Sequence, residues 1–367
     1  MNYYSLNKQA PNTSFKDAVI KGLAPDKGLY FPESITPLPK DFFENIDNLS
    51  YSEIAFEAIK QFVTPEIPEA VLKTIVEETL SFDFPIVPIT NNISTLELFH
   101  GPTLAFKDVG ARFMSRCLGY FSKQARAENA TANDHKSQED KTQDEKPSTV
   151  LVATSGDTGG AVANGFLGVT GVNVIILYPK GKVSPIQELQ LTTLGQNITA
   201  LEVDGSFDDC QAIVKEAFMD GELNASYNLT SANSINVARW LPQQLYYFFA
   251  WQQWVAKYQD ADGNYPPMHI VVPSGNFGNI CAGMIAKESG LPLGHFVAAC
   301  NANDVVTRYM ATEKYEVKPS VVTVSNAMDV GNPSNFVRIL EMMQNNFSTL
   351  SNALTSYSIT DTDTKAT

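Results

Sequence analysis

The sequence predicts an α/β fold built around a parallel sheet. From about residue 85 onward, short apolar segments alternate with segments of helical spacing, as in chains of β-α-β units. The segment 149–153 is apolar on both of its faces, which is typical of a parallel strand covered by helices on both sides. Two glycine-rich turns follow such segments directly, and ligands bind at this place in open α/β sheets. The expected strands are 86–88, 95–99, 149–153, 172–178, 198–203, 270–272 and 297–300.

The composition is that of a globular protein with enough chain for two to three domains. The 367 residues are 44% hydrophobic, and the formal net charge is −14 at pH 7. This negative charge argues against a nucleic acid or an anionic membrane as a partner, and no apolar run reaches membrane-spanning length. We expect a small-molecule substrate and a monomer or homodimer. A bound phosphate would need a local site made of backbone N–H groups or a few Lys and Arg side chains.

The cysteines and the N-terminus favour a cytoplasmic protein. Cys117, Cys210, Cys281 and Cys300 show no paired spacing, so we expect reduced and mostly buried thiols. The first residues contain neither a basic region nor an apolar core of a signal peptide. The histidines have no Cys or Asp partners at ligand spacing, and no metal site is expected.

The first 88 residues read as an N-terminal structural domain. A short strand closed by proline is expected at 28–32, and amphipathic helices are expected at 51–62 and 68–80. No cluster of titratable residues in this region indicates chemistry.

A lysine stands where an apolar strand gives way to a helix. The strand at 96–99 breaks at Gly101 and Pro102, and Val109 opens a run of apolar residues at helical spacing. The positive helix end and the apolar surroundings would both lower the pKa of Lys107. Such a lysine is a nucleophile that forms a Schiff base with a carbonyl substrate or with pyridoxal phosphate. Most lysines in this position only cover the helix start with their stem, so the neighbouring motifs decide between the two interpretations.

The segment 123–147 is almost free of large apolar residues. It cannot bury enough surface to offset the entropy lost on ordering, which predicts an exposed, mobile insertion. His135 within it is expected to be a solvated surface histidine.

Two glycine-rich turns, 154–161 and 273–279, each follow a predicted strand and precede a helix. Glycine allows positive φ and leaves backbone N–H groups open, and the helix dipole behind the turn favours an anion. Either turn alone is as compatible with tight packing as with a bound phosphate or carboxylate. Two such turns together with Lys107 favour a ligand site. Neither turn has GxGxxG spacing or a Gly-Lys-Ser/Thr ending, which leaves a smaller phosphorylated cofactor with an aldehyde.

Six segments of the chain resemble threonine synthase of the longer bacterial and fungal type. They run in order from the N-terminus to about residue 340. The motif Ser-Gly-Asp-Thr-Gly separates this group from the Ser-Gly-Asn-Thr-Gly of related sulfhydrylases and dehydratases. The segments are 96–113, 154–161, 178–185, 231–236, 273–279 and 325–330.

The resemblance implies a fold-type II pyridoxal-phosphate enzyme, similar to the tryptophan synthase β chain, with two α/β domains after an N-terminal extra domain. The reaction it implies is that of a carbon–oxygen lyase acting on phosphates, which converts O-phospho-L-homoserine and water to L-threonine and phosphate. The expected domains are 1–88, then 89–240 with the lysine and the first turn, then 241–367 with the second turn.

Transferred residue by residue, the resemblance implies a site for pyridoxal 5′-phosphate. Lys107 would form the Schiff base and take the α-proton of the substrate. Asp157 stands where relatives carry an asparagine bonded to the ring oxygen of the cofactor. The residues that would cradle the cofactor phosphate are Gly275, Asn276, Phe277, Gly278 and Asn279.

The resemblance also implies a site for the substrate. The residues that would take its α-carboxylate are Ser155, Gly156, Thr158 and Gly159. Its phosphate needs a second positive site, for which arginine suits a bidentate contact better than lysine. The cationic candidates are Arg112, Lys182 and Arg239, and the neutral donors are Asn233, Ser234 and Asn236. For any one cation, an ion pair with one of the many carboxylates is at least as good an explanation.

The resemblance fades over 348–367, a tail rich in Ser, Thr, Asn and Asp, and we expect a C-terminal truncation relative to the family. In the family, the further segment supplies the last strands and helices of the larger domain and a Ser/Thr group facing the pyridine nitrogen. Three functions therefore stay open: a threonine synthase, a related phospholyase or β-eliminating lyase, and an inactive homologue that binds only cofactor or a partner.

Overall fold

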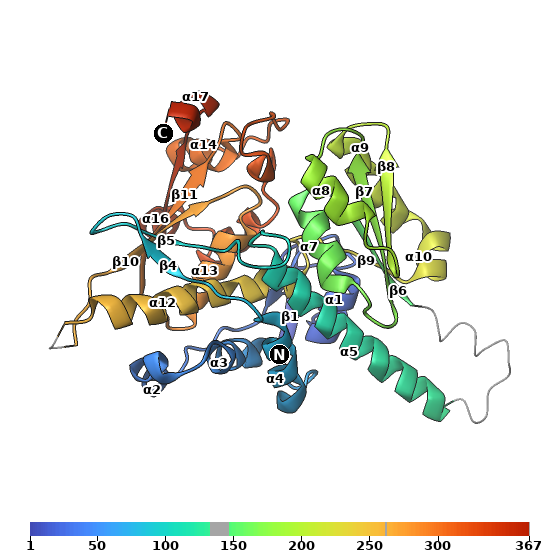
Figure 1. Cartoon of the computed structure of the whole chain (residues 1–367), viewed down its shortest axis with the longest axis horizontal. Helices are drawn as coiled ribbons and strands as arrows, with labels where there is room; N and C mark the ends of the chain where they lie inside the picture. The colour runs from blue at the N-terminus through green and yellow to red at the C-terminus, as the bar shows by residue number, and fades with distance from the viewer. Residues whose placement is uncertain (133–146, 261–262, 367) are drawn as a thin grey trace.

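Two parallel sheets form the frame of the molecule (Figure 1). The structure is a computed structural model that describes residues 1–132, 147–260 and 263–366. The first sheet has the strand order β8-β7-β6-β9, and the second has the order β10-β11-β12. Their bounds are β6 Ser148–Ala153, β7 Val172–Pro179, β8 Ile198–Val203, β9 Leu229–Thr230, β10 Met268–Pro273, β11 Leu293–Cys300 and β12 Leu354–Ser358. The predicted α/β class is confirmed.

Strand β6 is apolar from Val150 to Ala153 because both of its faces are covered. Val150 and Val152 point into the main hydrophobic core, whereas Leu151 and Ala153 belong to a second cluster with Val214 of helix α9. Successive side chains of a strand point to opposite faces, so a strand buried on both faces has no polar alternation. The helices around this sheet are α5 Asp108–Ala132, α7 Asp157–Phe166, α8 Pro185–Thr192, α9 Phe207–Met219 and α10 Gly221–Tyr227.

The N-terminal region forms an antiparallel sheet with its own helices. Strand β1 (Asn2–Ser5) pairs with β2 (Thr13–Ser14) and β3 (Tyr30–Pro32), and the expected strand at 28–32 is confirmed. The helices expected at 51–62 and 68–80 are α3 Tyr51–Val63, which has a capping box from Ser50 and Glu53, and α4 Glu69–Thr79. The remaining elements are α1 Phe15–Lys21, α2 Lys40–Glu44 and η1 Ile46–Asn48.

The segments 86–88 and 95–99 do not join a parallel sheet. Strand β4 (Ile86–Pro88) pairs antiparallel with β5 (Ser94–Leu96) in a separate two-stranded ribbon. The side chain of Gln253 holds this ribbon against helix α12, since it accepts from Ile86 N and donates to Phe84 O. The regular strand also ends at Leu96, before the expected residue 99.

The second sheet is surrounded by helices from the last third of the chain (Figure 1). Trp240 anchors this part to the N-terminal region, because its ring stacks on Phe31 with centroids 6.1 Å apart. The elements are α11 Val237–Trp240, η3 Leu241–Gln244, α12 Leu245–Tyr258, α13 Gly278–Glu288, α14 Val305–Thr312, η4 Asn326–Met328, α15 Phe336–Met342, α16 Phe347–Ala353 and α17 Asp361–Ala366.

One expectation about an irregular segment needs correction. The insertion expected over 123–147 begins as regular helix, because α5 continues to Ala132; residues 133–146, with His135, lie outside the described residues. The described part of the tail, 348–366, contains regular elements. Its strand β12 pairs in parallel register with β11, with Phe296 opposite Leu354. The division of the chain at 88 and 240 stays a prediction. Among the described residues, no helix is both long and apolar enough to cross a membrane.

We predict that Gly110→Ala destabilises the protein. Gly110 lies where α5 crosses α11, and a Cβ atom there would overlap the carbonyl oxygen of Arg239. Forcing the two helices apart is expected to lower the free energy of unfolding by about 1–3 kcal/mol, as measured by urea denaturation. Gly221→Ala is the control, because nothing lies within 4 Å of its Cβ position, and it should leave stability unchanged or slightly higher. Equal effects of the two substitutions would contradict close packing at Gly110.

Candidate functional site

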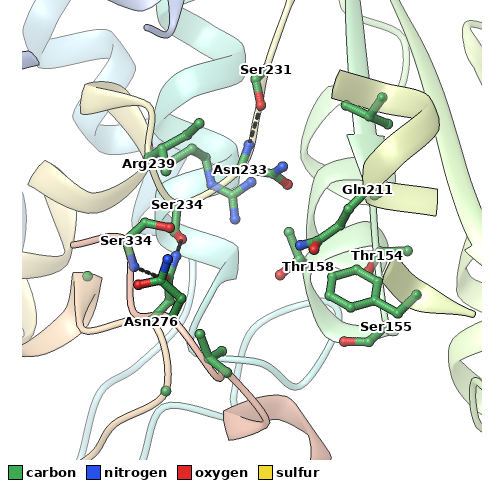
Figure 2. A pocket seen from close by; sticks show the side chains of 18 of the residues that line it. Thr154, Ser155, Thr158, Gln211, Ser231, Asn233, Ser234, Arg239, Asn276 and Ser334 are labelled. Carbon is green, nitrogen blue, oxygen red and sulfur yellow. Dashed lines mark hydrogen bonds between the residues drawn. The ribbon is translucent and has the colours of Figure 1, made fainter. Parts of the chain in front are cut away.

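A cleft of about 1170 Å³ opens between the loops that follow β6 and β10. Its lining residues come from many distant parts of the chain, which include the ranges 21–27, 106–107, 153–158, 207–219, 231–239, 275–279, 318–320 and 326–334. Figure 2 shows Ser155 and Thr158 on one wall and Arg239 and Asn276 on the opposite wall. Lys107 and all five residues of the turn from Gly275 to Asn279 line this same cleft. The lysine and the second glycine-rich turn are therefore brought together, as a bound phosphorylated aldehyde would require.

Lys107 lies directly before α5, and its two neighbours in the chain, Phe106 and Asp108, are both fixed by hydrogen bonds. The hydroxyl of Tyr246 donates to the carbonyl of Phe106, and the carboxylate of Asp108 accepts from Thr103 N at 2.9 Å. The side chain of Lys107 is only 16% exposed. A lysine with so little freedom presents its amine to the cleft in a narrow range of positions.

The expected lowering of the Lys107 pKa is confirmed. Burial is its largest cause, since desolvation disfavours the ammonium form. The carboxylate of Asp157, with Oδ2 3.8 Å from Lys107 Nζ, raises the pKa, and the guanidinium of Arg239 lowers it. The two neighbours thus act in opposite directions, and burial decides the net effect.

The first glycine-rich turn is organised by Thr154, a residue that sequence reasoning missed. Its Oγ1 accepts from Gly156 N at 3.0 Å and from Gly159 N at 2.8 Å. The N–H groups of these two glycines are therefore used inside the turn, whereas Ser155 and Thr158 line the cleft. Glycine is required at 156, where φ is 137°, a backbone conformation in which a side chain is strained. The position of Thr154 at the end of a strand was the signal that could have identified it.

Asp157 lies behind the cleft surface, beside Lys107. Its Oδ1 accepts from Gln187 Nε2 at 2.6 Å, and its other oxygen faces the amine. Gln187 comes from α8, so this helix orients the carboxylate.

The second glycine-rich turn forms an open cradle at the start of α13. Phe277 is the N-cap of this helix and adopts the left-handed conformation with φ 61°. A Cβ atom on Gly275 would lie 2.8 Å from the Cα of Met328, so the turn and the segment 326–328 approach as closely as glycine allows. The first N–H groups of a helix have no partners within it and favour an anion. These features fit the phosphate of a pyridoxal cofactor.

The side chain of Asn276 is used within the protein. Its Nδ2 donates to Ser234 Oγ at 2.6 Å, and its Oδ1 accepts from Ser334 N at 2.6 Å (Figure 2). Asn276 therefore joins the turn to the 231–236 segment, and its backbone N–H is the group left for a ligand. Ser334 carried no signal in the sequence, because its contact depends on a loop 58 residues away.

Arg239 is a buried cation that lines the cleft. It is 1% exposed, and its Nη1 donates to the carbonyl of Ala232, whereas its Nε has no hydrogen-bond partner in the described chain. Burial lowers the pKa of this guanidinium to about 10, so it stays charged at neutral pH. Figure 2 places it beside Asn233 and across from Thr158.

Six predicted residues are not among the described residues that line the cleft. Gly156, Asp157 and Gly159 belong to the first turn but lie behind its cleft surface, and the other three lie elsewhere. Arg112 donates from Nε to Thr79 O at 3.1 Å and from Nη2 to Ser81 Oγ at 2.9 Å, which holds it at the end of α4. Lys182 is exposed in the loop after β7. Asn236 is fully buried, caps α11 through Ala238 N, and donates to Val19 O and Ser231 O.

Several residues that sequence reasoning missed also line the cleft. They include four lysines whose spacing along the chain shows no pattern, and two glutamines. These residues are Lys21, Lys27, Lys215, Lys318, Gln211 and Gln243.

The chain matches two protein-family models. The model described as threonine synthase N terminus matches residues 2–80, and the model described as pyridoxal-phosphate dependent enzyme matches residues 94–366. The second match extends to residue 366, so the likeness to pyridoxal-phosphate enzymes continues through the tail at 348–366.

Curated relatives and solved structures carry the same description. The chain is 43% identical to a threonine synthase of Haemophilus influenzae over 94% of this chain and 75% of the relative. It is 40% identical to one of Escherichia coli over 94% and 74%. The crystal structure of the Escherichia coli threonine synthase matches with a TM-score of 0.86 and 38% identity, covering 100% of this chain and 79% of that one. A pyridoxal-phosphate-bound threonine synthase of Brucella melitensis also gives 0.86, at 34% identity, and covers 98% and 78%. The chain spans about three quarters of the length of these curated relatives.

We predict that Asp157→Asn lowers the pKa of Lys107 further. The carboxylate stabilises the ammonium form, and its loss leaves burial and Arg239 unopposed. Reductive methylation of Lys107 by formaldehyde and cyanoborohydride, followed by mass spectrometry, should therefore reach its half-maximal rate at a lower pH. Asp208→Asn is the control, because Asp208 also lines the cleft but is not a cause of the Lys107 shift. If the pH of half-maximal methylation is unchanged or higher in Asp157→Asn, Asp157 does not raise the pKa of Lys107.

Proposed function

The chain belongs to the threonine synthase family, and on that premise we propose which of its residues carry out the pyridoxal-phosphate-dependent conversion of O-phospho-L-homoserine and water to L-threonine and phosphate. The single observation that carries the proposal is that Lys107 and the turn from Gly275 to Asn279 line one cleft. An amine and an anion cradle in one cavity suit a ligand that carries both an aldehyde and a phosphate.

The cofactor is proposed to be held at three points. Lys107 would hold its aldehyde carbon, Asp157 would lie nearest to its ring oxygen, and the backbone N–H groups from Gly275 to Asn279 would bind its phosphate. When bound, pyridoxal phosphate supplies an electron sink that stabilises carbanions of an amino acid. The N-terminus of α13 supplies the positive potential for the phosphate without a charged side chain.

Lys107 is proposed to move the proton at the substrate α-carbon. Burial keeps its amine closer to neutrality than an exposed lysine, and a neutral amine accepts a proton. Asp157 then stabilises the ammonium that forms, because its carboxylate oxygen lies 3.8 Å from Nζ. The pair therefore suits a proton that must be taken up and later returned.

The α-carboxylate of the substrate is proposed to bind at the first turn. Ser155 and Thr158 line the cleft there, at the start of α7, where a helix N-terminus favours an anion. Gly156 and Gly159 contribute by shape, since their N–H groups bond to Thr154 Oγ1.

The substrate phosphate is proposed to bind at Arg239, with Asn233 and Ser234 as neutral donors. All three line the cleft, and Arg239 brings a positive charge to it. Arginine suits phosphate because its planar fork matches two oxygens at once. Arg112, Lys182 and Asn236 are not proposed for this role, because each is occupied or exposed elsewhere.

We further expect the chain to act in the cytoplasm as a monomer or homodimer. The four cysteines, Cys117, Cys210, Cys281 and Cys300, are buried free thiols, which suits a reducing compartment.

We predict that Lys107→Ala abolishes turnover. Loss of the proton-transferring group is expected to lower the rate of phosphate release from O-phospho-L-homoserine by roughly 10²–10⁴-fold, and the absorbance band of the bound cofactor should disappear. Lys40→Ala, a fully solvated lysine, is the control. Threonine and keto acid are measured together: release of keto acid in place of threonine would identify a lyase, and binding of cofactor without turnover would identify an inactive homologue.

We predict that Arg239→Gln weakens binding of phosphate-bearing ligands. Losing a charged hydrogen bond is worth about 1.5–3 kcal/mol, which is roughly a 10- to 150-fold rise in KM, with a similar rise in the inhibition constant of inorganic phosphate. Arg112→Gln is the matched control, since Arg112 lies outside the cleft lining. A normal KM in the Arg239 variant would indicate that another cation binds the substrate phosphate.

A further inference from the structure

A second arginine is buried behind the second glycine-rich turn. Arg338 of α15 is 0% exposed and lies 4.6 Å from the Trp240 ring. Its Nη2 donates to Tyr30 O at 3.0 Å and to Ile235 O at 2.7 Å, and its Nη1 donates to Asn335 Oδ1. One guanidinium thus joins the N-terminal region, the 231–236 segment and α15.

The charge of Arg338 has no carboxylate partner in the described parts of the chain. All of its hydrogen-bond acceptors are neutral oxygens. Arginine is almost never fully buried unless it is paired, because desolvating a charge is costly. Burial lowers its pKa to about 9, so the group is still charged at pH 7. A buried cation of this kind leaves a positive field that an anion nearby would offset.

Asn335 connects this cation to the turn at 275–279. Its backbone N–H donates to Asn276 O at 3.2 Å. Because its Oδ1 accepts from Arg338, its Nδ2 faces the other way and lies 3.3 Å from the Cβ position of Gly278. This Nδ2 is buried and has no hydrogen-bond partner within the described residues. Phe336 completes the contact, since its ring meets that of Phe277 edge to face at 5.5 Å.

We propose that Asn335 and Arg338 are positioning residues of the cofactor-phosphate site, where the guanidinium supplies buried positive charge behind the N-terminus of α13 and Asn335 holds the 275–279 turn against it. The inference rests on the proposed function, because it takes the phosphate monoester of the cofactor as the anion of that turn. The inference adds Arg338 to the cofactor-phosphate site, as a cation that does not itself line the cleft.

The buried position of Arg338 explains how its charge acts on a phosphate that it does not contact. A dianion at the start of α13 already meets the helix dipole, and a cation in a low-dielectric interior acts over a longer distance than one in water. Through Ile235 O the same guanidinium fixes the 231–236 segment, which carries the residues proposed for the substrate phosphate. The two anion sites therefore share one buried support.

Two substitutions separate charge from shape. Asn335→Asp keeps the acceptor for Arg338 and nearly the same volume but places a carboxylate beside the guanidinium and the turn. Arg338→Lys keeps the positive charge and removes the fork. Asn92→Asp, in the exposed turn between β4 and β5, adds the same charge elsewhere and serves as the control.

The readout is binding of pyridoxal 5′-phosphate and of pyridoxal to the full-length apoprotein, together with the thermal shift produced by inorganic phosphate. We expect Asn335→Asp to weaken pyridoxal 5′-phosphate binding about tenfold or more, to leave pyridoxal binding within about twofold, and to remove most of the phosphate-induced shift. Arg338→Lys should retain the phosphate-induced shift even where its melting temperature without ligand is lower. Asn92→Asp should match the unsubstituted protein.

Two outcomes for Asn335→Asp would overturn the inference: equal weakening of pyridoxal and pyridoxal 5′-phosphate binding, or no weakening of either. If Asn335 and Arg338 had only a structural role, their substitution would not affect the phosphate-bearing ligand more than the other. Failure of the proposed function has a different signature: the unsubstituted protein would then bind pyridoxal 5′-phosphate without involving Lys107, or would not bind it.

Discussion

The chemistry of the cleft depends on the burial of the Lys107 amine between two opposite charges. Burial and Arg239 favour the neutral amine, and Asp157 favours the ammonium. Neither neighbour is free to move away, because Asp157 is held by Gln187 and Arg239 by the carbonyl of Ala232. An amine balanced in this way can act in turn as nucleophile, base and acid, since small changes in its surroundings shift its protonation. The rest of the fold keeps these three groups, from three distant segments, within reach of one another.

The acidic chain carries positive potential locally, at its cleft. Its net charge is −14, yet six Lys and Arg residues and only two Asp residues are found among the described residues that line the cleft. Charges on the distant surface are screened over about 10 Å at ordinary ionic strength, whereas buried guanidinium groups and helix N-termini act where the dielectric is low. Overall charge therefore argues against nucleic acid as a partner and remains compatible with a phosphate ligand. The two arginines at and behind the cleft, Arg239 and Arg338, are both almost fully buried, which makes their fields local and strong.

Features that depend on neighbours in the chain were predictable from the sequence, and features that depend on distant segments were not. The expected strands 149–153, 172–178 and 198–203 match β6, β7 and β8 within one residue. For β6 and β7 the reason is that a buried parallel strand has an apolar pattern of its own. The strands β4 and β5 were wrongly predicted to join the parallel sheet. They pair antiparallel with each other, and the side chain that hydrogen-bonds to them, Gln253, lies far along the chain. Arg112 was an equal candidate with Arg239 by residue type, and its contacts with Thr79 and Ser81 at the end of α4 distinguish the two. The role of Thr154 was readable in principle, whereas that of Arg338 rests on carbonyl groups of Tyr30 and Ile235 that no local pattern brings together.

The two glycine-rich turns occupy the same place between a strand and a helix, but they present different groups to the cleft. Both follow a parallel strand and open a helix, but in the first turn the hydroxyl of Thr154 takes up two backbone N–H groups, and the side chains of Ser155 and Thr158 reach the cleft. In the second turn the left-handed Phe277 turns the backbone toward the cleft, and Asn276 directs its side chain to Ser234 and Ser334. Hydroxyl groups rotate and release a ligand with little cost, whereas a fixed set of N–H groups at a helix start holds a dianion firmly. This difference matches the proposed division of work, in which the first turn exchanges a substrate carboxylate in every cycle and the second retains the phosphate of a resident cofactor.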